Sequence, residues 1–183
     1  MTEIIGISGS LRAGSLNAAL LHAAAQLMPD GASLGVASIK GIPLYDGDVE
    51  ANDGIPEIVA ALQDRIAASN GVLLVTPEYN NAMPGVLKNA IDWLSRPPAD
   101  IPRVFGNRRV AIIGASPGGF GTILAQNAWL PVVRTLGMRP WFGERLMVAR
   151  AGTVFNQEGE IVDEKIKEQL RRFMHHFVDF VQS

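Results

Sequence analysis

Short apolar runs alternate with longer segments of helical period along this chain, and this alternation restricts the fold more than any other feature. The runs lie at residues 3–8, 33–39, 71–76, 109–116 and within 138–149. Those at 3–8, 71–76 and 109–116 are almost continuously hydrophobic. Such runs are typical of parallel strands that are buried on both faces. We therefore predict five strands in a parallel sheet.

Segments with helical spacing separate or follow these strands, near residues 15–28, 55–69, 84–96, 120–136 and 161–181. The last has the clearest pattern, an apolar stripe at Val162, Ile166, Leu170, Phe173, Phe177, Phe180 and Val181. Strands that alternate with helices form an α/β fold, and 183 residues suit one domain. The sequence predicts a single domain over 1–183, with a doubly wound five-stranded parallel sheet and helices on both faces.

Charge and composition exclude several classes of function. The net charge of −2 gives no basic footprint for nucleic acid, and we predict that the pairs Arg108-Arg109 and Arg171-Arg172 are solvated. The chain has no cysteine, which removes disulfides, thiol nucleophiles and Cys-ligated metals. No long apolar segment or charged leader is present, so we expect a cytoplasmic protein without membrane insertion.

The loop after the first strand, "GSLRAGSLN" at 9–17, nearly matches a nucleotide-binding P-loop but lacks its lysine. Ser10, Ser15 and Asn17 can donate to phosphate oxygens, and Arg12 adds a full charge. A helix that begins here adds free N–H groups. We interpret the loop as a site for one phosphate group. An ordinary strand-to-helix turn with a Ser/Asn cap is the alternative.

The loop after the third strand, "TPEYNNAMP", is stiffened by Pro77 and Pro84. Asn80 and Asn81 suit tight turns, and Tyr79 offers an aromatic wall. Such a loop can lie along the edge of a flat heterocycle and bond its polar rim. The alternatives are a packing loop or an oligomer contact.

The loop after the fourth strand, "GASPGGFG" at 114–121, lacks the spacing of a dinucleotide fingerprint. Taken alone it reads as a flexible loop. Ligands of doubly wound sheets bind beyond the carboxyl ends of the strands, beside the switch in strand order. Ser116 and Gly118 therefore stand where a third wall of the same pocket is needed.

No set of side chains suggests acid–base catalysis or metal binding. His22, His175 and His176 lie in predicted helices without metal-ligand spacing, and Glu78 is the only carboxylate in the three loops. We therefore predict no catalytic side chain and no metal. One phosphate clamp beside a flat-ring pocket indicates a cofactor that brings its own chemistry, and flavin mononucleotide (FMN) fits.

The segments "GSLRAGSLN" and "TPEYNNAMPGVLKNAIDWLSR" resemble the NAD(P)H-dependent FMN reductase family, in particular its quinone, chromate and azo-dye reductase branch. The resemblance covers nearly the whole chain, including "IPLYD" at 42–46. It implies a flavodoxin-like fold with strand order 2-1-3-4-5, FMN as cofactor and NADPH or NADH as co-substrate.

The resemblance also implies roles for individual residues. The residues that would hold the FMN phosphate are Ser10, Arg12, Ser15, Leu16 and Asn17. Those around the isoalloxazine ring would be Pro77, Glu78, Tyr79 and Asn80, largely through backbone groups, with Ser116 beside the ring. The helix that would make dimer contacts carries Lys88, Asn89, Asp92 and Trp93, for which plain helix packing and surface charge are the alternative.

The expected reaction passes hydride from NAD(P)H to the flavin and then electrons to a small-molecule acceptor, in ping-pong order. Acceptors of this branch are quinones, azo compounds and chromate.

We expect a homodimer rather than a homotetramer. The segment after residue 119 lacks the polar and aromatic side chains that make tetramer contacts in some relatives. Two other functions remain open: a flavodoxin-type electron carrier that docks to redox proteins, and a flavin-dependent sensor or assembly component. Such carriers tend to be acidic and to lack an arginine like Arg12.

Overall fold

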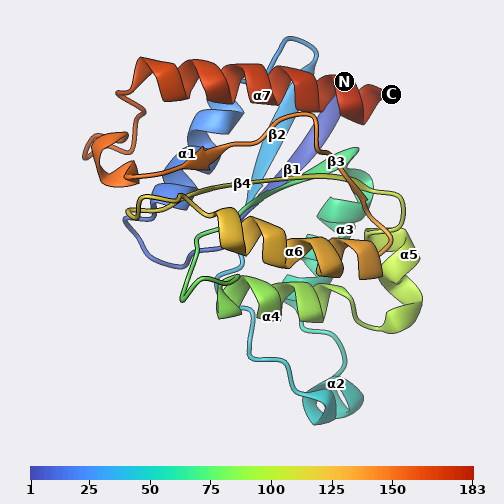
Figure 1. Ribbon diagram of the computed structural model, residues 1–183. Coiled ribbons are helices and arrows are strands. Elements are labelled where there is room, and N and C mark those ends of the chain that lie inside the picture. The colour runs from blue at the N-terminus through green and yellow to red at the C-terminus, as the bar shows by residue number, and fades with distance from the viewer.

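The computed structural model describes residues 1–183 and has a central parallel sheet between two layers of helices (Figure 1). Its strand order is β2-β1-β3-β4-β5, with β6 also paired to β4. The strands are β1 (Thr2–Ser8), β2 (Ala32–Ala37), β3 (Gly71–Val75), β4 (Arg109–Ala115), β5 (Arg139–Pro140) and β6 (Met147–Val148). This is the flavodoxin-like order that the family resemblance implied.

The last edge strand, predicted as one run within 138–149, is interrupted. β5 pairs with Arg109 and Val110 of β4, and β6 pairs with Gly114 and Ala115. Between them, residues 141–146 leave the sheet. Trp141 lies against Phe173 and other aromatic rings of the last helix, so the chain turns out of the sheet plane at this position.

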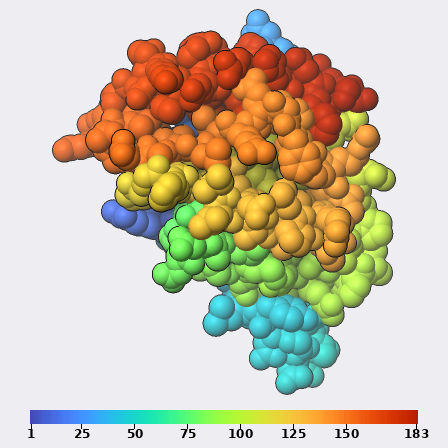
Figure 2. All heavy atoms as spheres, viewed as in Figure 1, coloured from blue at the N-terminus to red at the C-terminus, as the bar shows by residue number.

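Two helices cover one face of the sheet, α1 (Leu16–Gln26) and α7 (Glu164–Gln182). The other face carries α3 (Glu57–Ala68), α4 (Gly85–Leu94), the short α5 (Ile101–Val104) and α6 (Ile123–Thr135). Two 3-10 turns lie at Pro98–Asp100 and Ala151–Thr153. The helix α2 (Gly47–Asp53), absent from the sequence prediction, protrudes from the body of the molecule (Figures 1 and 2).

The apolar stripe predicted for the last helix is confirmed over most of its length. Leu170, Phe173 and Phe177 are buried against the sheet. Val162 was placed wrongly in this stripe, because it precedes the helix and is 55% exposed. The helix begins later because the Asp163 carboxylate accepts the N–H groups of its first turn. No helix of the chain combines the length and apolarity needed to cross a membrane.

The central strands are buried on both sides. In β1, Ile4 packs in the layer with α1 and α7, whereas Ile5 and Ile7 pack in the layer with α3, α4 and α6. This alternation follows from the two-residue period of a strand. Because β1, β3 and β4 are parallel neighbours, the three predicted loops follow them at the same edge of the sheet.

One surface prediction was wrong. Arg108 is not solvated, since its guanidinium donates to the carbonyl oxygens of Ala67, Ser69 and Val104. Burial lowers the pKa of the Arg108 guanidinium below its usual value. Arg108 therefore fastens the ends of α3 and α5 rather than presenting charge to a partner.

Candidate functional site

The three predicted loops meet in one pocket. A hollow of about 150 Å³ lies between the ends of β1, β3 and β4. Nine of the ten residues predicted to bind the cofactor line it: Ser10, Arg12, Ser15, Leu16, Asn17, Pro77, Glu78, Tyr79 and Ser116. The tenth, Asn80, lies outside the lining. The fold thus brings together residues that are more than a hundred positions apart in the chain.

The first loop presents a run of backbone donors that the chain leaves free. From Ser10 to Asn17, only the N–H of Arg12 has an acceptor before the helix, the Ser10 hydroxyl at 3.4 Å. The Ser15 hydroxyl caps α1 by accepting the N–H of Ala18 at 3.1 Å. Free N–H groups at a helix N-terminus are the usual partners of a phosphate or another anion.

Arg12 stands beside these donors without a partner of its own. Its side chain is exposed, and the ion pairs of the chain all involve other residues. A free guanidinium next to several free N–H groups suits a dianion such as a phosphate monoester.

Asn17 has a structural task that the sequence did not reveal. Its side chain is buried, donates to the Ala115 carbonyl oxygen at 2.8 Å and accepts the Ala115 N–H at 2.9 Å. One of its two amide N–H groups and its amide oxygen are therefore bonded to Ala115 at the end of β4. Its backbone N–H has no acceptor in the chain and remains available. The side chain joins the first loop of the pocket to the third.

The second loop forms a tight turn, as predicted from its asparagines. The N–H of Tyr79 donates to the Ala82 oxygen at 3.1 Å, and the N–H of Ala82 donates back at 3.0 Å. Asn80 and Asn81 both have positive φ, 51° and 61°, as in a type I′ turn. This conformation holds Tyr79 at the pocket with 49% of its surface exposed.

Glu78 connects the second loop to a helix. Its carboxylate accepts the N–H groups of Leu124 at 2.9 Å and Ala125 at 3.0 Å, in the first turn of α6. A carboxylate at this place satisfies two free donors and complements the helix dipole. The side chain is therefore engaged with the first turn of α6.

Replacing Glu78 with alanine should lower the free energy of unfolding by about 1 kcal/mol, the usual cost of losing an N-terminal cap. Urea denaturation checks this value. Glu78→Gln keeps an oxygen acceptor and should lose less than half as much. Equal stability of Glu78→Ala and the unmodified protein would contradict the capping role.

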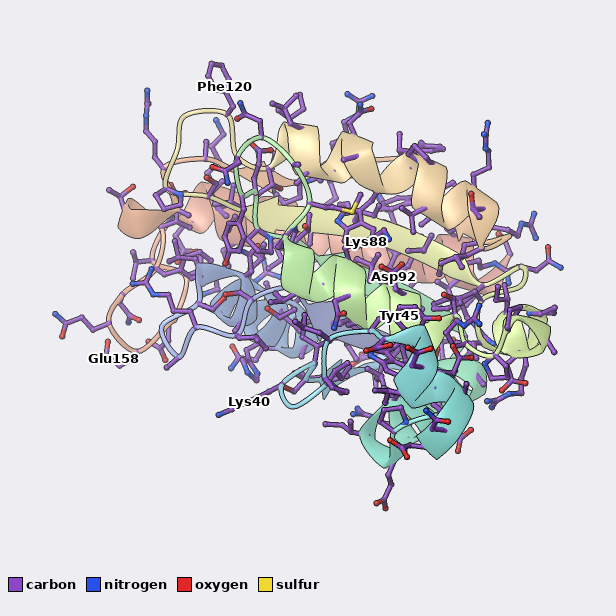
Figure 3. The ribbon with its side chains drawn as sticks, turned by 90° about the horizontal axis from the view of Figure 1, so that it is seen from below. Lys40, Tyr45, Lys88, Asp92, Phe120 and Glu158 are labelled. Atoms are coloured by element: carbon purple, nitrogen blue, oxygen red, sulfur yellow. The ribbon has the colours of Figure 1, made fainter.

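The third loop bends around Ser116, whose hydroxyl accepts the N–H of Gly118 at 3.1 Å. The N–H of Ser116 donates to the Val148 oxygen at 2.9 Å, which fixes this residue to β6. Figure 3 shows Phe120 at the tip of the loop, directed away from the body of the molecule. Phe120 is 84% exposed. The loop therefore has a fixed base at the pocket and an exposed apolar tip.

The helix expected to make dimer contacts, α4, binds the segment around Pro43 through two of its side chains. The indole N–H of Trp93 and the amide of Asn89 both donate to the Pro43 oxygen, at 3.0 and 2.8 Å. Trp93 is fully buried, so its side chain packs within the chain. Lys88 and Asp92 form an ion pair at 2.6 Å on the surface of α4 (Figure 3). The packing alternative holds for Trp93 and Asn89.

An ion pair attaches α2 to the residues that follow this helix. Arg96 donates to Glu50 at 2.7 Å and lies over the ring of Tyr45, whose hydroxyl donates to the same carboxylate at 2.9 Å. The hydrogen bond from Arg96 lowers the pKa of the Glu50 carboxyl below its ordinary value. The hydrogen bond to Glu50 raises the pKa of the Tyr45 hydroxyl. These contacts fix the protruding helix next to α4.

The pocket contains groups for binding and orientation but no catalytic pair. Glu78 is its only carboxylate and is already bonded to α6, and no histidine lines it. No group of three His, Asp or Glu side chains in the chain could hold a metal ion. The donor set fits FMN: free N–H groups, hydroxyls and Arg12 for one phosphate, and an open tyrosine-edged wall for a flat ring. Bond-making chemistry at this site would come from the cofactor.

Comparisons with known proteins agree with this geometry. A model of the family described as "NADPH-dependent FMN reductase" matches residues 2–153. An NAD(P)H-dependent FMN reductase of Pseudomonas aeruginosa is 43% identical over 93% of this chain and 90% of its own. A 2-hydroxy-1,4-benzoquinone reductase of a Burkholderia species is 38% identical over 99% of this chain and 97% of its own.

A solved structure is also similar along the whole chain. FerB of Paracoccus denitrificans, a flavoenzyme NAD(P)H:(acceptor) oxidoreductase, superimposes with a TM-score of 0.88 and 32% identity. The match covers 100% of this chain and 98% of FerB. The likeness therefore includes the strands, the helices and all three loops of the pocket.

Proposed function

The chain belongs to the NADPH-dependent FMN reductase family, and we propose that it is an FMN-dependent oxidoreductase that transfers electrons from NAD(P)H to quinones. FMN is its cofactor, and NADPH or NADH is its reductant. The run of free N–H groups from Ser10 to Asn17 beside unpaired Arg12 carries this proposal most directly, because it is a ready site for one phosphate.

The residues that line the pocket divide into two groups. Those proposed to hold the phosphate are Ser10, Arg12, Ser15, Leu16 and Asn17, with Leu16 and Asn17 acting through their N–H groups. Those proposed to frame the ring are Pro77, Glu78, Tyr79, Asn80 and Ser116. When bound there, FMN supplies the redox chemistry by accepting hydride from NAD(P)H and reducing a second substrate. The protein positions the ring and leaves one side accessible.

The choice of acceptor depends on how open the pocket is. Tyr79 is half exposed, and the hollow of about 150 Å³ is small for a site that would enclose a whole ligand. An open ring face admits small planar oxidants, so we propose quinones as the principal acceptors, with azo compounds and chromate as further ones. NAD(P)H and the acceptor occupy the same face in turn. Initial rates at several fixed quinone concentrations should therefore give parallel double-reciprocal lines.

An anaerobic absorbance titration of the purified protein with NADPH, and separately with NADH, tests the function. The flavin bands should bleach within seconds, and the two rates rank the nucleotides. Bands that stay oxidised would favour an electron carrier over a reductase. A colourless protein that takes up no added FMN would refute the flavin site.

Arg12→Ala should weaken FMN binding roughly 10- to 100-fold, because a hydrogen bond to a charged group contributes about 1.5–3 kcal/mol. Titration of the apoprotein with FMN, followed by quenching of flavin fluorescence, measures this change. Riboflavin, which lacks the phosphate, is the control ligand, and its affinity should stay the same. Equal losses for both ligands would place Arg12 away from the phosphate.

We also propose that the protein is a cytoplasmic homodimer, with a homotetramer as the alternative. Exposed apolar side chains lie on the second and third loops of the pocket, among them Tyr79 and Phe120. Such a surface suits contact with a second copy of the chain. Light scattering after size exclusion, at micromolar concentration, should give about twice the monomer mass of 19.6 kDa.

A further inference from the structure

The interruption of the edge strand leaves the backbone N–H and C=O of one residue of the sheet, Ile112, without a partner. On the open side of β4, the Val110 oxygen accepts the N–H of Trp141 at 2.8 Å, and the N–H of Gly114 donates to Leu146 at 3.4 Å. Alternate residues of a strand point their backbone groups the same way, so Ile112 also faces this edge. Neither its N–H nor its C=O forms a hydrogen bond within the chain.

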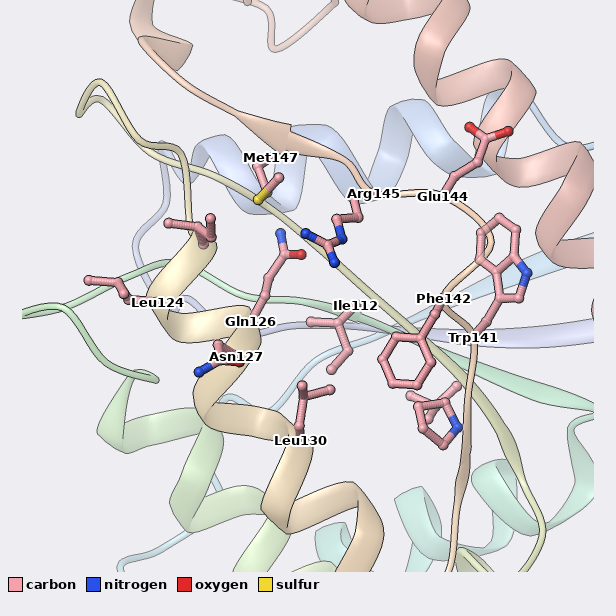
Figure 4. Close-up of a pocket in the computed structure, with 13 residues that line it drawn as sticks. Ile112, Leu124, Gln126, Asn127, Leu130, Trp141, Phe142, Glu144, Arg145 and Met147 are labelled. Carbon is pink, nitrogen blue, oxygen red and sulfur yellow. The ribbon is translucent and has the colours of Figure 1, made fainter.

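Ile112 lines a cavity at this edge of the sheet. It lies between α6 and residues 140–147 and has a volume of about 340 Å³, more than twice that of the pocket described above. Its walls are mainly apolar and include Leu130, Trp141, Phe142 and Met147 (Figure 4). This size and lining are typical of small-molecule sites.

The cavity also contains an unpaired positive charge. Figure 4 shows the guanidinium of Arg145 directed into the space between Gln126 and Ile112. The neighbouring carboxylate of Glu144 points away and pairs with Arg172 and His176 of α7. Arg145 takes part in no ion pair of the chain. A ligand can therefore reach its charge without displacing a carboxylate.

We propose that this cavity is a second ligand site, which binds a small aromatic carboxylate. The carboxylate would accept from Arg145 and from the free N–H of Ile112, and the ring would lie between Leu130 and Phe142. One guanidinium and one peptide N–H match a singly charged anion, whereas a phosphate site usually offers several converging donors. The apolar walls favour an aromatic ring over a sugar or a polar chain.

The site is separate from the flavin pocket but shares a helix turn with it. Leu124 lines the cavity, and its N–H is the group that Glu78 accepts from the flavin side. The proposal does not depend on FMN binding. It depends on the gap in the edge strand and on Arg145.

Isothermal titration calorimetry of the FMN-loaded protein with 2-naphthoate tests the proposal. We expect one site per chain with a Kd on the order of 0.1 mM, as for a fragment-sized ligand in an apolar pocket. Arg145→Gln should weaken 2-naphthoate binding at least tenfold. The neutral analogue 2-naphthalenemethanol should bind more weakly than 2-naphthoate, and Arg145→Gln should leave its affinity unchanged.

Two further variants make the result specific to this cavity. Arg134→Gln removes an exposed, unpaired arginine elsewhere on α6 and should not alter the affinity. Leu130→Trp fills the cavity while keeping Arg145, and should abolish binding. The proposal is overturned if Arg145→Gln binds 2-naphthoate as well as the unmodified protein does. It is also overturned if no saturable binding occurs, or if 2-naphthoate shifts the flavin bands or is displaced by NADH.

Discussion

Asn17→Asp should lower the free energy of unfolding by about 3 kcal/mol and the melting temperature by about 10 °C at pH 7. The Asn17 amide is buried and bonds both the oxygen and the N–H of Ala115. The introduced carboxyl keeps the acceptor but replaces the donor by an oxygen that faces the Ala115 oxygen. It also places a charge in a buried position.

The loss of stability in Asn17→Asp should increase as the pH rises. Burial and the facing oxygen raise the pKa of the introduced carboxyl above its value of about 3.9 in the unfolded chain. The folded variant then binds more protons than the unfolded one, so its stability falls as the pH rises through this range. The deficit should be smallest near pH 4, where the carboxyl is protonated and can donate to Ala115.

Thermal and urea unfolding at pH 4 and pH 7 measure both effects. Asn52→Asp is the matched control, because Asn52 is exposed in α2 and the same change there should cost less than about 0.5 kcal/mol. Equal stability of the Asn17 and Asn52 variants would show that the hydrogen bonds from Asn17 of α1 to Ala115 of β4 contribute nothing to the free energy of unfolding.

Gly114→Ala should cost at least about 3 kcal/mol, because an added methyl group has no room in this part of the fold. A Cβ at Gly114 would overlap the Thr76 carbonyl oxygen and the Thr122 hydroxyl. Thr76 precedes the second loop of the pocket, and Thr122 precedes α6. Either the strands or the helix must move, so the variant should also retain less FMN.

Gly85→Ala is the control for this change. Gly85 opens α4, has no positive φ, and a Cβ there would meet nothing within 4 Å. The control should be as stable as the unmodified protein or gain about 0.5 kcal/mol, since alanine favours the helix. Urea midpoints and the ratio of flavin to protein absorbance compare the two variants. If the Gly114 variant had the same urea midpoint and the same flavin content as the Gly85 variant, the packing argument would be contradicted.

Asn17, Glu78 and Gly114 act at the junctions between the three loops. Asn17 joins the first loop to the third, and Glu78 joins the second to α6. Gly114 allows the ends of β3 and β4 and the start of α6 to approach closely. The pocket is therefore rigid at its base because each loop is bonded to another part of the site.

The sequence was sufficient to predict the sheet, most helices and the place of the site. The apolar runs at 3–8, 71–76 and 109–116 correspond to β1, β3 and β4, because burial on both faces leaves a clear hydrophobic signal. The loops that follow them could be placed together because parallel strands all end at one edge. Nine of the ten predicted residues meet there for that reason.

Only the tertiary structure decided what individual side chains do. Asn17 bonds Ala115 at a separation of 98 residues, and Glu78 bonds Leu124 at a separation of 46, so no local pattern contains these pairs. The break in the edge strand likewise depends on the packing of Trp141 against α7. The cavity beside Arg145 depends on this break. Periodicity and turn chemistry are local and can be read along the chain. Hydrogen bonds and packing between distant segments exist only once the chain has folded.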